Sequence, residues 1–114
     1  MKVELTRFKL KKGKSEKADE WIKMLRENLP AVLETFNDEK MYVEAIFREK
    51  LNGEDYLYWF SVQGEGGKRI EESKHEIDKK HLEYFKECID IKSPGYRADI
   101  PLELFMKSKG TQFK

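Results

Sequence analysis

The amino-acid sequence predicts a single α+β domain in which strands and helices follow one another in the order βαββαβ. Three observations lead to this prediction. The chain has 114 residues, which is the usual size of one domain. Two segments have the apolar spacing of helices, and four others have the alternation or the β-branched and aromatic content of strands. The dipeptide Asn52-Gly53 predicts a tight hairpin between the middle two strands, because both residues tolerate positive φ.

The first predicted strand covers residues 2–10. Val3 and Leu5 share one face of it with Arg7, and the apolar residues then change to the other face at Phe8. Such a change indicates either a bulge that shifts the register or a strand that is covered on both faces.

The first predicted helix begins after Ser15, a plausible N-cap, and extends to about residue 29. Pro30 should kink or restart the helix, because proline has no backbone N–H and clashes with the preceding turn. We expect a shorter turn or helix after it, and a loop at residues 37–39.

The predicted hairpin joins strands at residues 40–50 and 56–62. Its even-length loop pairs odd positions of the first strand with even positions of the second. One face looks like the domain core and carries Val43, Ala45, Phe47, Tyr58, Phe60 and Val62. The other face mixes large apolar groups with charges, as interfaces often do, and carries Tyr42, Glu44, Ile46, Arg48, Leu57, Trp59 and Ser61.

The second predicted helix covers residues 68–89, and the last strand covers residues 100–107, where Pro101 indicates a sheet edge. The predicted domain therefore spans residues 1–107, followed by a C-terminal tail at residues 108–114.

Two crossover helices on one face of a four-stranded sheet leave the other face uncovered. An uncovered apolar face is rare in monomers, so the sequence predicts a homodimer that forms through the sheet face. Glu44 and Arg48 are expected to pair across it. The residues predicted to form this dimer face are Phe8, Ile46, Arg48, Leu57 and Trp59.

The composition argues against several classes of partner. The chain has 23 basic and 22 acidic residues and a net charge of +1, without the basic surplus that nucleic-acid binding normally requires. No apolar run is long enough to cross a membrane. The start of the chain has no apolar signal core, and its single cysteine, Cys88, predicts a buried structural thiol. We therefore expect a cytoplasmic protein.

The element order, the length and the two-faced aromatic hairpin resemble those of the dimeric α+β barrel superfamily, which has a ferredoxin-like fold. Over residues 1–107 the sequence is most similar to uncharacterised small bacterial members. A more distant similarity links it to antibiotic-biosynthesis monooxygenases, which implies cofactor-independent chemistry. The resemblance carries no diagnostic motif and supports the fold more than the function.

Haem-degrading members of this superfamily use an Asn on the first strand, a Trp near the second hairpin strand and a His on the second helix. This chain has Trp59 and His81 in comparable elements, but it has Arg7 and no Asn on the first strand. The predicted faces also separate Trp59 from His81 by the sheet. Haem degradation is therefore disfavoured, and no cofactor is predicted.

A pocket between sheet and helices is the predicted ligand site, lined by Arg7, Tyr58, His81 and Tyr84. The first three are also the catalytic candidates. His81 could transfer a proton or orient a ligand, because its ordinary pKa lies near neutrality, and Arg7 could recognise a carboxylate. Both could equally be satisfied internally. His75 and His81 are six residues apart and do not share a helix face, so no metal site is predicted.

The glycine-rich segment at residues 64–69 lacks the Ser or Thr of a phosphate-binding loop and is expected to be a hinge or a plain loop. Three functional hypotheses remain. The protein binds a small organic ligand between sheet and helices, or it is a cofactor-independent monooxygenase-like enzyme acting on an aromatic substrate. Alternatively, it is a protein-interaction module without catalysis.

Overall fold

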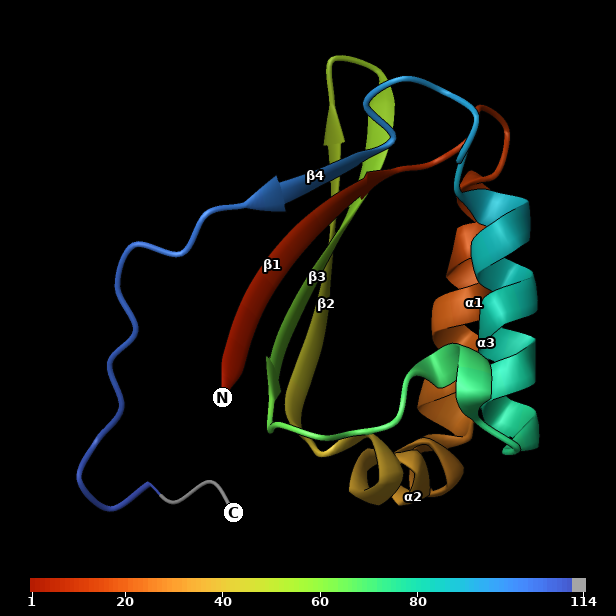
Figure 1. Cartoon of the computed structure of the whole chain (residues 1–114). Helices are drawn as coiled ribbons and strands as arrows, with labels where there is room; N and C mark the ends of the chain where they lie inside the picture. Colours follow the sequence, from red (N-terminus) through yellow and green to blue (C-terminus); the bar gives the residue numbers. More distant parts are fainter. Residues whose placement is uncertain (112–114) are drawn as a thin grey trace.

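A four-stranded antiparallel sheet forms one layer of the protein, and three helices form the other (Figure 1). This arrangement comes from a computed structural model that describes residues 1–111. The strands are β1 (Lys2–Lys9), β2 (Met41–Leu51), β3 (Glu54–Gln63) and β4 (Arg97–Ile100), in the spatial order β2-β3-β1-β4. The helices are α1 (Ser15–Glu27), α2 (Leu29–Glu39) and α3 (Glu76–Cys88). The predicted α+β class and ferredoxin-like element order are confirmed.

The break between α1 and α2 confirms the restart predicted at Pro30. Pro30 lies in the first turn of α2, where the missing N–H would have had no partner within the helix. The loop predicted at residues 37–39 is wrong, because α2 continues to Glu39. It ends at Lys40, which takes a left-handed conformation with φ 55°, as helix C-caps often do.

The segment before α3 also differs from the prediction. Residues 64–75, which we call the strap, contain only a 3₁₀ turn, η1 (Ile70–Glu72), and α3 begins eight residues later than expected. The strap crosses from the sheet to the helical layer beside α2 (Figure 1). The backbone N–H of Lys68 donates to the Asp38 carbonyl oxygen at 2.8 Å. A Cβ on Gly67 would lie 2.0 Å from the Glu39 carbonyl oxygen, so only glycine allows this approach.

The last strand is shorter and earlier than predicted. β4 ends at Ile100, and Pro101 follows it, which has no N–H to continue the ladder. The predicted edge position is confirmed by the strand order. Residues 101–107 leave the sheet on the side away from the helices (Figure 1). Of the predicted tail, residues 112–114 lie outside the described part of the chain.

The hairpin has the predicted register, with Asn52 and Gly53 both at positive φ and Ala45 opposite Phe60. The assignment of its faces is wrong. Leu57, fully buried, and Phe8 belong to the core cluster beneath the helices. The other face, which we call the open face, carries Val43, Ala45, Phe47, Tyr58, Phe60 and Val62. Phe47 on this face is 60% exposed.

All the residues predicted to form a dimer face therefore lie on the helix side of the sheet. Ile46 and Trp59 pack against the core cluster. Arg48 donates to the Ser15 carbonyl oxygen at 2.9 Å and to its hydroxyl at 2.7 Å, and it also pairs with Asp19. The expected pairing of Arg48 with Glu44 across a dimer is wrong for the same reason. Because Ser15 and Asp19 of α1 supply these contacts, the Arg48 guanidinium can lie on the sheet face that the helices cover.

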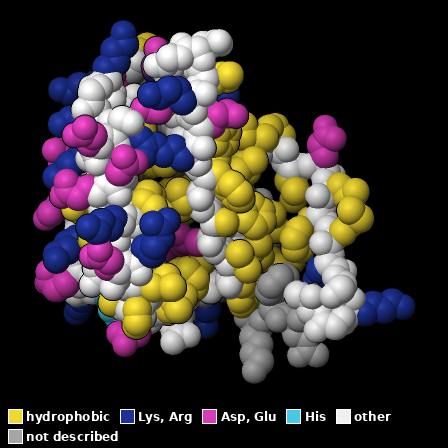
Figure 2. Space-filling view, turned by 180° about the vertical axis from the view of Figure 1, so that it is seen from behind, with side chains coloured by type: hydrophobic (Ala, Val, Ile, Leu, Met, Phe, Trp, Pro, Cys, Tyr) yellow, Lys and Arg dark blue, Asp and Glu magenta, His cyan; other side chains and the backbone are white. Residues whose placement is uncertain are grey.

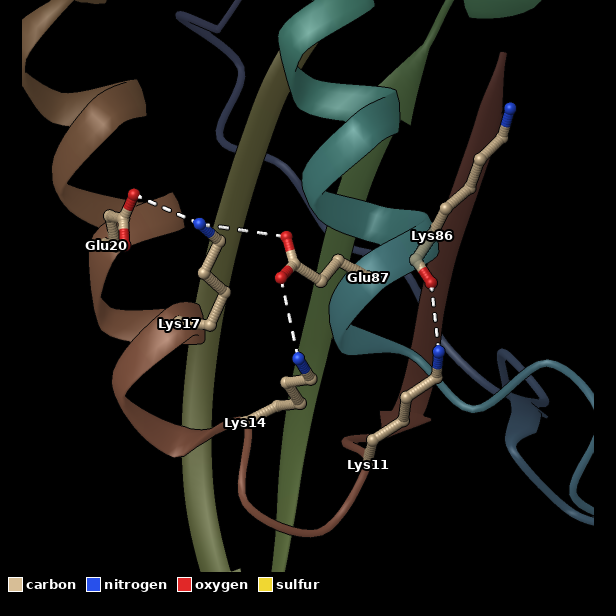
Figure 3. A network of polar contacts seen from close by, with 6 residues as sticks. All are labelled: Lys11, Lys14, Lys17, Glu20, Lys86 and Glu87. Carbon is tan, nitrogen blue, oxygen red and sulfur yellow. Dashed lines mark hydrogen bonds and ion pairs between the residues drawn. The ribbon is translucent and has the colours of Figure 1, made fainter.

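The core and a set of polar contacts join α1 to α3. Fully buried Trp21 and Cys88 lie in the core cluster, which confirms the prediction of a buried thiol. Outside the core cluster, Lys17 forms ion pairs with Glu20 and Glu87, and Lys14 also forms an ion pair with Glu87 (Figure 3). These pairs are exposed, so they contribute less to stability than the core does.

Within residues 1–111, none of the helices combines the length and the apolar character that a membrane span needs.

Candidate functional site

A cavity of about 390 Å³ opens between the helical layer and the sheet. Its walls are mainly apolar and come from every helix and from β2 and β3, with Leu25, Val32, Ile46 and Ile77 as examples. Two further spaces of about 580 and 330 Å³ adjoin it, and Trp59, Ile70 and His81 line all three. A concave apolar site with a few converging polar groups is the usual form of a small-molecule site.

Three carboxyl groups from three different elements line this cavity: Glu39 at the end of α2, Glu44 on β2 and Asp78 on α3. Glu39 is 8% exposed and Asp78 is 6% exposed. Burial of this kind is costly for a carboxylate without a cationic partner. The three residues are far apart in sequence, so the cluster exists only in the folded chain.

Glu39 is the carboxyl group that the cavity perturbs most. Burial raises its pKa to about 7, against the opposing effect of the Thr35 hydroxyl, and the charges of Asp78 and Glu44 raise it further. The Glu39 side chain is therefore partly protonated at neutral pH and could give up a proton to a bound ligand.

Glu44 is held in a defined position by Trp59. The indole Nε1–H of Trp59 donates to the Glu44 carboxylate at 2.9 Å. Burial raises the pKa of Glu44, the Trp59 hydrogen bond lowers it, and the charge of Asp78 raises it. The hydrogen bond offsets part of the effect of burial, and the pKa of Glu44 is raised less than that of Glu39, which makes Glu44 the better candidate for a base.

Asp78 carries an incompletely satisfied carboxyl group. Among the described residues, its Oδ2 atom is buried and has no hydrogen-bond partner. A buried acceptor without a partner costs about 1–3 kcal/mol.

The aromatic wall of the cavity contains Trp59 and His81, whose ring centroids are 5.1 Å apart. Trp21 lies behind both of them, and its Nε1–H donates to His81 Nδ1 at 3.0 Å. Burial lowers the pKa of His81 to about 4, so the imidazole is neutral at physiological pH. The predicted separation of Trp59 from His81 is wrong, because it followed from the reversed face assignment.

The four predicted pocket residues do not come together. Arg7 and Tyr58 lie on the open face, where the Arg7 guanidinium stands 5.3 Å from the Tyr56 ring centroid and Tyr58 donates to Glu49 at 2.8 Å. The expectation that the Arg7 guanidinium lies in a pocket between sheet and helices is therefore wrong. Tyr84 is stacked on Trp21 and donates to Glu20 at 2.9 Å. Of the four, only His81 lines the cavity.

Sequence reasoning missed Glu39, Glu44 and Asp78 as site residues. The signal for Glu44 was present, because it shares a strand face with Ile46 and Arg48, but that face was assigned to a partner. Glu39 was expected in a loop, and Asp78 follows Ile77 on α3 without any local motif.

Within residues 1–111, no group of three or more His, Cys, Asp or Glu side chains is arranged to hold a metal ion.

Comparisons with known proteins give a family and a fold. No curated protein matches the chain. The crystal structure of L-rhamnose mutarotase from Formosa agariphila is similar, with 20% sequence identity, a TM-score of 0.55 and coverage of 96% of this chain and 100% of that chain. The likeness extends to the fold, and the expected similarity to monooxygenases stays a prediction. The model of a family of unknown function, DUF6176, matches residues 1–112. Since that match covers nearly the whole chain, the protein belongs to the DUF6176 family.

Proposed function

We propose that the cavity binds a small, neutral, polyhydroxylated molecule such as a monosaccharide and catalyses proton transfer on it. The observation that carries this proposal is the convergence of Glu39, Glu44 and Asp78 on one apolar cavity beside Trp59. Carboxyl groups repel anionic ligands and hydrogen-bond hydroxyl groups, and an aromatic ring packs against the C–H face of a sugar. The fold shared with an L-rhamnose mutarotase supports the choice of a sugar.

The reaction that suits these groups is the interconversion of sugar anomers. A base removes the proton of the anomeric hydroxyl while an acid protonates the ring oxygen, and the bond between the anomeric carbon and the ring oxygen breaks. Rotation in the open-chain aldehyde and the reverse proton transfers close the other anomer. Glu44 serves as the base because its pKa is raised less than that of Glu39, and the Trp59 hydrogen bond opposes the effect of burial on it. Glu39 serves as the acid because its pKa is about 7.

A ligand screen followed by a kinetic assay tests this function. Thermal shift is measured with neutral monosaccharides including L-rhamnose, sugar acids, aromatic acids, quinones and haem, since a ligand of the folded state raises the melting temperature. Exchange between sugar anomers is then followed by NMR. We expect stabilisation by at least one neutral sugar, and a rate of its anomer exchange that depends on the protein concentration.

Site variants make the assay specific. Glu44→Gln and Glu39→Gln should each lower the catalysed rate by roughly 10²-fold or more. Glu34→Gln, which changes an exposed carboxyl group on the same helix as Glu39, should leave it unchanged. Stabilisation by aromatic acids alone would instead favour the monooxygenase-like alternative, and silence across the panel would favour the interaction module.

We further propose that the protein is a homodimer that forms through the open face, with residues 101–107 reaching the partner. Support comes from the exposure of apolar side chains on this side, including Phe47 at 60%, Leu104 at 68% and Met106 at 78%. Figure 2 shows hydrophobic side chains gathered between the charged helical surface and the C-terminal segment. Monomers rarely expose such a surface.

Light scattering after size-exclusion chromatography tests the assembly. The wild type should have about twice the 13.6 kDa mass of the chain. Phe47→Glu should give a monomer, whereas Ile91→Glu should not, because Ile91 is similarly exposed at 50% but follows α3 instead of lying on the sheet. A wild-type monomer would refute this part of the proposal.

A further inference from the structure

The hydrogen bond between Trp21 and His81 determines which imidazole nitrogen can carry a proton. An indole N–H is only a donor, so the 3.0 Å contact from Trp21 Nε1 makes His81 Nδ1 the acceptor. The neutral imidazole then carries its proton on Nε2. Protonation of Nδ1 would direct two N–H groups at each other and leave a buried donor without a partner, which costs about 1–3 kcal/mol.

Trp21 is held rigidly enough to impose this arrangement. Its side chain is fully buried. The Tyr84 ring stacks on it with centroids 6.5 Å apart and planes at 4°, and the Phe85 ring meets it edge-on at 6.1 Å. Trp59 packs against it at 5.9 Å. The indole therefore cannot turn its N–H away from His81 without displacing three rings.

His81 in turn lies between the buried Trp21 and the cavity. Its ring centroid is 5.4 Å from that of Trp21 and 5.1 Å from that of Trp59. It lines the main cavity and both adjoining spaces. Among the described residues, Trp21 is the hydrogen-bond partner of its ring. Nε2, on the other side of the imidazole, is therefore the nitrogen left for a ligand.

We propose that Trp21 is a positioning residue that fixes His81 as a neutral hydrogen-bond donor, with Nε2–H directed to an acceptor oxygen of the bound molecule. This inference rests on the proposed function and refines it. It predicts a ligand with an ether, carbonyl or hydroxyl oxygen at this position and disfavours a protonated amine there. It also removes His81 from the role of base, which leaves proton abstraction to the carboxyl groups.

The tautomer can be read directly by NMR of the wild-type protein with ¹⁵N-labelled histidine and tryptophan. We expect His81 Nδ1 at the chemical shift of an unprotonated imidazole nitrogen and Nε2 at that of an N–H. A scalar coupling between Trp21 Nε1 and His81 Nδ1 should report the hydrogen bond itself. A wild-type His81 that is protonated on Nδ1 at pH 7 would overturn the inference, whether or not any sugar binds.

Two variants separate the hydrogen bond from packing. Trp21→Phe removes the N–H, and we expect the single His81 tautomer to become a mixture. Phe85→Leu disturbs packing against the same indole but leaves its N–H, and the tautomer should not change. If both variants keep the wild-type tautomer, Trp21 does not position His81. Should Trp21→Phe fail to fold, the scalar coupling measured in the wild type still tests whether Trp21 donates to His81.

Titration of the labelled wild type with L-rhamnose tests the part that concerns the ligand. The Nε2 signal of His81 should shift, and the Nδ1 signal should move less. An unshifted Nε2 signal in the presence of a sugar that does raise the melting temperature would overturn the proposed contact. Absence of any sugar binding would instead contradict the proposed function, while the tautomer measurement stands independently.

Discussion

Replacing Glu39 by glutamine should stabilise the protein at alkaline pH and much less at acidic pH. Burial raises the pKa of Glu39 from 4.5 to about 7, so between these values the folded chain binds more protons than the unfolded chain. Stability must therefore fall as the pH rises through this window. Glutamine has nearly the same shape but no charge, so the variant does not carry this dependence.

The size of the effect follows from the two pKa values. A change in pKa from 4.5 to about 7 makes ionised Glu39 about 3 kcal/mol less favourable in the folded state than in the unfolded state. Part of that difference is already present at pH 5, where the unfolded carboxyl group is mostly ionised. Between pH 5 and pH 8, the stability of Glu39→Gln relative to wild type should rise by about 2.5 kcal/mol.

Urea denaturation from pH 5 to pH 8 measures the difference between variant and wild type. The difference is needed because His81 acts in the opposite direction. Its pKa is lowered to about 4, so it removes stability as the pH falls below its ordinary value of 6.5, equally in both proteins. Glu34→Gln, at an exposed position of α2, is the matched control and should follow wild type.

A pH-independent difference between Glu39→Gln and wild type would refute the reasoning. It would mean that Glu39 is ionised in the folded state across the range, and the acid proposed for the cavity would be lost. A larger slope than expected would indicate a stronger effect of the Asp78 and Glu44 charges, which also raise the pKa of Glu39.

Three further predictions concern the strap, the hairpin and the core. Gly67→Ala should lower the free energy of unfolding by about 1–3 kcal/mol, because its Cβ would lie 2.0 Å from the Glu39 carbonyl oxygen. Urea denaturation measures this change, and an unchanged midpoint would contradict the close approach of the strap to α2. Arg48→Met should cost about 2 kcal/mol by the same assay, because it removes charged hydrogen bonds to Ser15; a neutral result would mean that these bonds are not formed in solution. Cys88 is fully buried, and burial raises the pKa of its thiol, so Ellman's reagent should label it only after unfolding; rapid labelling of native protein would show that the helix pair opens.

Local chemistry in the sequence was enough to predict the order of the elements. The turn at Asn52 and Gly53, the restart at Pro30 and the register of the hairpin all follow from backbone preferences that act over a few residues. The buried position of Cys88 followed from helical spacing. These features depend on neighbours along the chain, so they can be inferred without knowing the fold.

The orientation of the sheet could not be inferred in this way. Both faces of the hairpin carry large apolar groups, and the face with Glu44 and Arg48 looked too polar to be covered by helices. Only the tertiary structure supplies Ser15 and Asp19 as partners for Arg48. Charges that find partners on other elements can be placed inward, and the sequence alone does not show those partners.

The candidate site depends on the same feature, which is the face of the sheet that the helices cover. Of the predicted pocket residues, His81 lines the cavity, and its place on α3 could be inferred from helical spacing. Glu39, Glu44 and Asp78 became a site only because α2, β2 and α3 meet at one cavity. The amino-acid sequence by itself thus determined the order of the helices and strands and the approximate place of most of them. Tertiary packing decided which side chains are buried together, because burial and pairing are set by contacts between residues distant in the chain.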